Sequence, residues 1–136
     1  MAVATYNDYL REMLGKAECI LAFDTAADFL GLTNGGYREK AQIFAAKKLD
    51  IDDTEQITVP SLEMIECEKR HGLLCTTVNQ TIVNLLEQDG DEQIITESLA
   101  NYYEDHGESF AGLKIPKRLE ERFQKYKAWA VEYYEE

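Results

Sequence analysis

Apolar residues recur at the spacing of an α-helix along most of this chain, and few residues interrupt them. Leu74, Val78, Ile82 and Leu85 follow one another at intervals of four, four and three residues. Such spacing places the side chains on one face of a helix. Only two prolines and eight glycines are available to break helices across 136 residues. The pattern predicts an all-α fold, an irregular bundle of five to seven helices in a single domain over residues 1–136.

Capping and helix-breaking residues give these helices approximate ends. Thr5 and Asp91 are placed to cap helices, and Pro60 suits the first turn of another. Residues 19–23 and 56–59 also fit strands, so a small β element is the alternative to a purely helical fold. A short strand needs a partner to be stable, and the sequence identifies none. The expected helices cover residues 6–14, 26–32, 37–49, 60–71, 73–88, 92–104 and 117–134.

The chain is strongly acidic. It carries 26 Asp and Glu residues against 14 Lys and Arg, a formal net charge of -12. This balance disfavours binding to nucleic acids and anionic membranes and favours partners with basic surfaces. Apolar residues make up 45% of the sequence, enough for a folded core rather than a disordered acidic tail. The acidity is concentrated in residues 51–115, of which 71–115 hold eight acidic residues and one base, Lys114.

Sequence motifs that carry catalysis are missing. The chain contains no GxGxxG, GxxxxGK(S/T) or GxSxG pattern, and it has only two histidines. Carboxylate pairs are common in so acidic a chain, so their presence indicates nothing specific. We therefore expect neither enzymatic activity nor a cofactor.

These properties favour a non-enzymatic protein-interaction module, such as an adaptor, a regulator or an inhibitor. In a sharper form of this hypothesis the chain is a nucleic-acid mimic, whose carboxylates replace phosphates and block a basic nucleic-acid-binding protein. Aromatic residues gather near the C-terminus, where Tyr and Trp suit an interface with a partner or with a second copy of the chain. The expected partner-binding residues are Asp52, Asp53, Glu55, Asp89, Asp91, Glu92, Tyr103, Glu104, Asp105, Glu108 and Tyr134.

An alternative function follows from residues 25–38, which resemble the middle of a helix-turn-helix DNA-binding motif. Ala27, Gly31, Leu32 and Thr33 match the pattern of alanine, turn glycine, apolar residue and Ser or Thr. The resemblance implies a DNA-binding regulator in which residues 25–49 form two helices. Gly35 and Gly36 depart from the pattern. The phosphate contacts that it implies would come from Arg38, Lys40, Lys47 and Lys48.

A metal-binding protein or metalloenzyme is a further alternative. Cys67, His71 and Cys75 are spaced four residues apart and would share one face of a continuous helix. The two cysteines would then lie about 12 Å apart along the helix axis, so a second segment would have to complete the site. Cys19 and His106 are the available donors. We favour the simpler interpretation, two buried thiols and a histidine at a helix end, and predict no metal site.

The cysteines also indicate the compartment. Their number is odd and no CxxC pair occurs, which favours reduced thiols over a disulfide framework. Residues 1–9 lack the basic start and apolar run of a secretory signal. The sequence therefore predicts a cytoplasmic protein.

Overall fold

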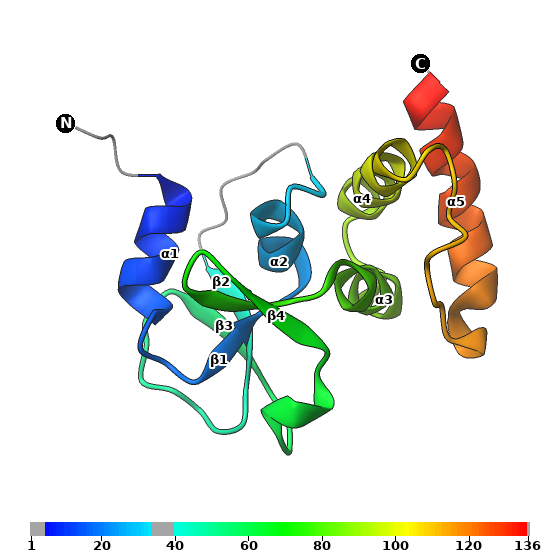
Figure 1. Ribbon diagram of the computed structural model, residues 1–136. Helices are drawn as coiled ribbons and strands as arrows, with labels where there is room; N and C mark the ends of the chain where they lie inside the picture. Colours follow the sequence, from blue (N-terminus) through cyan, green and yellow to red (C-terminus); the bar gives the residue numbers. More distant parts are fainter. Residues whose placement is uncertain (1–4, 34–39, 136) are drawn as a thin grey trace.

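The structure is a mixed α/β fold rather than a helical bundle. The computed structural model describes residues 5–33 and 40–135, and within these it contains five α-helices, two 3-10 helices and one five-stranded sheet (Figure 1). The expected all-α bundle is therefore wrong. None of the helices in the described part of the chain is long and apolar enough to cross a membrane.

Strands and helices alternate in the first half of the chain, and the second half is helical. The sheet has the order β3-β2-β1-β5-β4. Its pairs β1–β5 and β2–β3 are parallel, whereas β1–β2 and β4–β5 are antiparallel. The elements are α1 (Tyr6–Leu14), β1 (Cys19–Leu21), α2 (Phe23–Phe29), β2 (Ala41–Ala45), β3 (Thr54–Thr58), η1 (Leu62–Met64), β4 (Cys67–Arg70), β5 (Leu73–Thr76), α3 (Val78–Gln88), α4 (Glu92–Asp105), η2 (Lys117–Leu119) and α5 (Glu120–Glu135).

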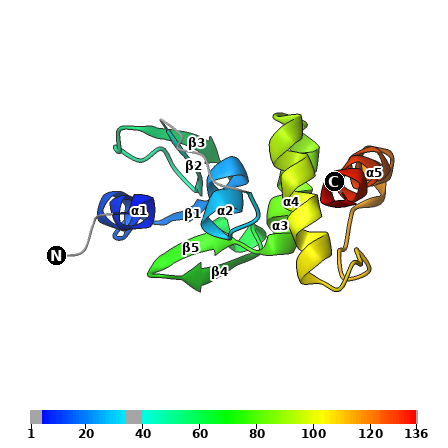
Figure 2. The same ribbon diagram turned by 90° about the horizontal axis from the view of Figure 1, so that it is seen from above.

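The two faces of the sheet are covered differently. Alternate residues of a strand point to opposite faces. Leu21 and Ile43 pack with α1 and α2 on one face, whereas Ile20 and Phe44 pack on the other face with the segment 59–65. Helices α1 and α2 therefore cover one face, the face seen from above in Figure 2. A loop with η1 covers the other face.

Helices α3, α4 and α5 form a layer beside the sheet, which we call the helical layer. In Figure 1, α3 and α4 are seen nearly end-on and α5 crosses them on the side away from the sheet. The core of this layer includes Leu86, Leu99, Tyr126 and Ala130, all fully or almost fully buried. Arg122 of α5 donates to the Leu86 carbonyl (2.7 Å) at the end of α3. Helices α3, α4 and α5 therefore form one packed unit.

Three expected helices are strands in part or in whole. The segment 37–49 contains β2, whose five residues are all buried because the strand lies inside the sheet. The segment 60–71 contains η1 and β4. The segment 73–88 is β5 followed by α3, with Thr77 as the cap between them.

Other local predictions are confirmed. Thr5 caps α1 and Asp91 caps α4, and the last helix has approximately the expected bounds. The segments 19–23 and 56–59, taken above as an alternative β element, overlap β1 and β3.

Candidate functional site

The acidic residues expected to bind a partner fall into three separate groups. The edge group, Asp52, Asp53 and Glu55, precedes and enters β3 at one edge of the sheet. The turn group, Asp89, Asp91 and Glu92, joins α3 to α4. The helix-end group, Glu104, Asp105 and Glu108, lies at and beyond the other end of α4. Because α4 has 14 residues, its two ends are roughly 20 Å apart. The three groups do not form one continuous acidic surface.

The turn group is largely engaged inside the protein. The Tyr126 hydroxyl donates to Asp89 Oδ1 (2.7 Å), and Arg122 Nε lies 3.7 Å from Asp89 Oδ2. Asp91 Oδ1 accepts from the Gln93 backbone N–H (2.9 Å), the usual role of an N-cap. Two of the three carboxylates therefore stabilise the α3–α4 turn and the docking of α5.

The helix-end group lies beside aromatic rings from three segments. Tyr103 contacts Tyr134 edge-on, with ring centroids 5.3 Å apart, and stacks on Phe110 at 4.9 Å. The Tyr134 hydroxyl donates to Glu108 Oε1 (3.2 Å), and this bond raises the pKa of Tyr134. Glu104 and Asp105 are exposed. The ion pairs found within residues 5–33 and 40–135 include neither of them, nor Glu108. The fold thus brings Tyr134 of α5 against Tyr103 and Glu108, which lie close together in the sequence but far from Tyr134.

Two aromatic residues of α5 are more exposed than the sequence indicated. Tyr103 and Tyr134, expected to be exposed, are half-buried against each other. Trp129 and Tyr133 are 39% and 41% exposed. Helical spacing continues the buried residues Leu119, Phe123, Tyr126 and Ala130 to Tyr133, so the exposure of Tyr133 was not predictable from this pattern, whereas Trp129 lies beside the buried face.

The described basic residues of the helix-turn-helix resemblance do not lie on a second helix. Lys40 directly precedes β2, and Lys47 and Lys48 follow it. Arg38 lies outside the described residues. The expected two-helix arrangement of residues 25–49 is therefore wrong, because a buried strand replaces the DNA-contacting helix.

The candidate metal ligands Cys67, His71 and Cys75 are separated by the sheet. Cys75 belongs to the core under α1 and α2, whereas Cys67 packs on the opposite face. His71 lies in the turn between β4 and β5 and contacts the Phe29 ring edge-on, at 5.8 Å. The expected continuous helix is wrong, and the two thiols cannot bind the same ion. No group of three His, Cys, Asp or Glu side chains converges among the described residues.

The burial of the thiols predicts their reactivity. Burial raises the pKa of Cys75 to about 12 and that of Cys19 to about 11, so neither forms the reactive thiolate near neutral pH. We expect rapid alkylation of half-buried Cys67 alone in the folded protein, and of all three cysteines in denaturant. Mass spectrometry after a short iodoacetamide pulse measures this. Cys67→Ser should remove the fast reaction, and rapid labelling of Cys75 would contradict the fold.

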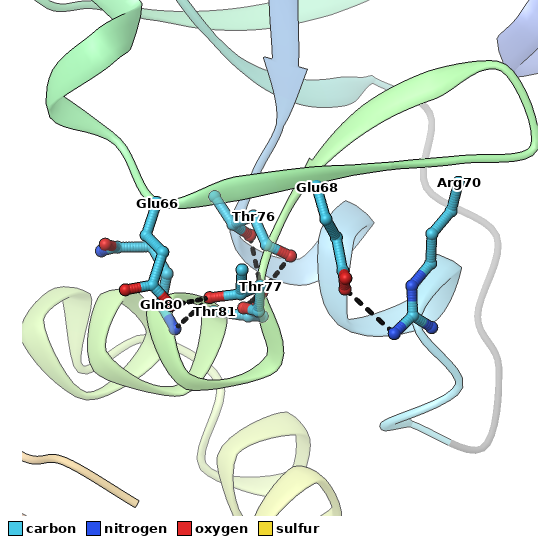
Figure 3. Close-up of polar contacts among 7 residues, drawn as sticks. All are labelled: Glu66, Glu68, Arg70, Thr76, Thr77, Gln80 and Thr81. Carbon is cyan, nitrogen blue, oxygen red and sulfur yellow. Dashed lines mark hydrogen bonds and ion pairs between the residues drawn. The ribbon is translucent and has the colours of Figure 1, made fainter.

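A polar cluster joins β4, β5 and α3 without leaving reactive groups free. Figure 3 shows Glu66, Glu68 and Arg70 extending from the same side of β4. The Thr77 hydroxyl donates to Glu66 Oε1 (2.7 Å), and Arg70 pairs with Glu68 at 2.9 Å. The buried hydroxyl groups of Thr76 and Thr81 lie 2.6 Å apart. The contacts of Thr77 with Glu66 and of Thr76 with Thr81 link the strands to the start of α3, whereas the Arg70–Glu68 pair stays on the exposed surface of β4.

The helix-end group with Tyr103, Phe110 and Tyr134 is the candidate site that the geometry favours. Of these residues, Tyr103, Glu108 and Phe110 line a hollow of about 590 Å³, which Glu120 and Lys127 of α5 also line. Its chemistry suits a positively charged partner rather than an anion. No family model, no curated protein and no solved structure matches this chain.

Proposed function

We propose that this protein is a non-enzymatic interaction module that binds a basic surface of another protein through its helical layer. The observation that carries the proposal is the helix-end group, where Glu104, Asp105 and Glu108 lie beside Tyr103 and Tyr134 without an ion pair in the described structure. Such carboxylates attract cations, and the neighbouring rings supply the area that interfaces bury.

The charge distribution supports the helical layer over the sheet edge as the binding surface. Residues 89–113 hold seven acidic residues and no Lys or Arg. Lys127 of α5 lines the same hollow as Glu108, and its Nζ lies 5.7 Å from the Phe110 ring centroid. None of the ion pairs in the described part of the chain joins Lys127 to Glu104, Asp105 or Glu108, so these carboxylates can attract a basic partner.

The sharper form of the proposal is a nucleic-acid mimic, an inhibitor that occupies the basic surface of a nucleic-acid-binding protein. Acidic groups at both ends of α4 would then replace phosphates along that surface. Competition decides between the two forms: a mimic and duplex DNA exclude each other from the partner, whereas an adaptor and DNA bind together.

Two charge-matched variants test the proposal. One carries Glu104→Gln, Asp105→Asn and Glu108→Gln, and the control carries Asp52→Asn, Asp53→Asn and Glu55→Gln. With a fluorescent arginine-rich peptide, anisotropy should show roughly three- to hundredfold weaker binding for the helix-end variant and a small change for the control. The wild-type affinity should fall steeply with added salt.

Equal effects of the two variants would show that binding depends on net charge rather than on this surface. Unchanged affinity of the helix-end variant would remove the proposal. Circular dichroism of both variants checks that the substitutions at these exposed positions leave the fold intact.

A further inference from the structure

A second hollow in the helical layer combines exposed aromatic rings with carboxylates. It is lined by Glu92, Gln93 and Thr96 of α4 and by Trp129, Glu132 and Tyr133 of α5, with a volume of about 310 Å³. We call it the α4–α5 groove. Its two rings are among the few large apolar side chains that stay well exposed in the described structure. Solvent-exposed aromatic rings beside polar groups are typical of binding surfaces.

The charges around the α4–α5 groove favour a cation. Glu92 and Glu132 line it, and Asp91 lies at the start of the same helix. Two positive charges oppose these carboxylates. Lys125 Nζ lies 5.1 Å from the Trp129 ring centroid. The N-terminal end of the α4 dipole adds the equivalent of about half a positive charge. Asp91 offsets that dipole, because it accepts from the Gln93 N–H at 2.9 Å. Among the described residues the carboxylates outweigh the cation.

We propose, on the basis of the function inferred above, that the α4–α5 groove receives an arginine side chain of the basic partner. A guanidinium group is planar, so it can stack on an aromatic ring while forming paired hydrogen bonds with a carboxylate. Trp129 and Tyr133 offer the rings, and Glu92 and Glu132 offer the carboxylates. Lys125 already lies over Trp129, with its Nζ 5.1 Å from the ring centroid, which shows that this groove ring accepts a cation.

The single tryptophan of the chain reports on this groove directly. Trp129 is the only tryptophan, so its emission changes only if its own surroundings change. Titration with the arginine-rich peptide should produce a saturable change in emission. The same peptide with citrulline in place of arginine keeps the shape but lacks the charge, and it should produce no change.

Three variants test which groups carry the interaction. Glu92→Gln combined with Glu132→Gln should weaken binding of the peptide roughly two- to twentyfold. Glu12→Gln combined with Glu18→Gln is the matched control, because it removes the same charge from exposed positions that line neither the α4–α5 groove nor the hollow at the helix-end group. Lys125→Ala should strengthen binding, since it removes the internal cation that competes for Trp129.

The outcomes separate this inference from the proposed function. If the peptide binds through the helix-end group while Trp129 emission and the affinity of the groove variant stay unchanged, the groove is not a binding site and the function stands. If the arginine-rich peptide does not bind at all, both proposals fail. A saturable emission change that depends on Glu92 and Glu132 supports both.

Discussion

Replacing Leu73 with alanine should lower the free energy of unfolding by about 2–5 kcal/mol, whereas Leu74→Ala should cost about 1 kcal/mol or less. The two leucines are adjacent on β5, so their side chains point to opposite faces of the sheet. Leu73 is 4% exposed in the core under α1 and α2, and Leu74 is 39% exposed on the outer face. Urea denaturation followed by Trp129 fluorescence measures both values.

This pair distinguishes a strand from a helix at residues 73–76. In a helix, Leu74 would share its buried face with Val78 and Ile82, and its truncation would be the costly one. A larger loss at Leu74 than at Leu73 would therefore contradict β5. Equal m-values for the two variants would show that the comparison concerns the native state rather than the compactness of the unfolded chain.

The error at residues 73–88 has a physical cause. The strand β5 passes into α3 through a single residue, so an apolar helical pattern that is correct from Val78 onward extends backward over the strand without interruption. The sequence did contain a signal for the boundary between β5 and α3. Thr77 followed three residues later by Gln80 fits the capping-box pattern, and the Thr77 hydroxyl does accept from the Gln80 N–H at 3.2 Å.

The strand β2 was harder to predict from the sequence. A strand covered on both faces shows no alternation of polar and apolar residues, and its alanines favour a helix. A helix over residues 41–45 leaves the strand-like segment 56–59 without a partner strand. In the structure these two segments pair with each other, with Phe44 opposite Ile57. Tertiary pairing overrides local preference here.

The sequence predicted which kinds of residue form the candidate site, but not which of them lie close together in space. The acidic residues and the C-terminal aromatics were identifiable from composition, and the helix carrying Glu104 and Asp105 was expected. Which carboxylates remain free depends on contacts between distant segments. Asp89 was expected to face a partner, but Tyr126 and Arg122 of α5 engage it, which no local pattern in the sequence reveals.

The burial of Tyr126, together with its hydrogen bond to Asp89, makes stability depend on pH in the alkaline range. Burial, followed by the bond to Asp89, raises the pKa of Tyr126 to about 12, above its ordinary value near 10. Between these values the unfolded chain loses the phenolic proton and the folded protein keeps it, so the unfolded state binds fewer protons and stability falls as pH rises. This contribution is fully present below pH 10 and amounts to about 2–3 kcal/mol.

Tyr126→Phe should isolate that contribution. At pH 8 the variant should be less stable than the wild type by about 1–3 kcal/mol, because a hydrogen bond to a charged acceptor is lost. As pH rises from 10 to 12 the difference should shrink, since phenylalanine has no proton to lose. Tyr102 and Tyr134, whose pKa values are also raised, are present in both proteins and cancel in the comparison. A constant difference across this range, measured by urea denaturation, would mean that folding does not raise the pKa of Tyr126, and would contradict both the burial of its hydroxyl group and the bond to Asp89.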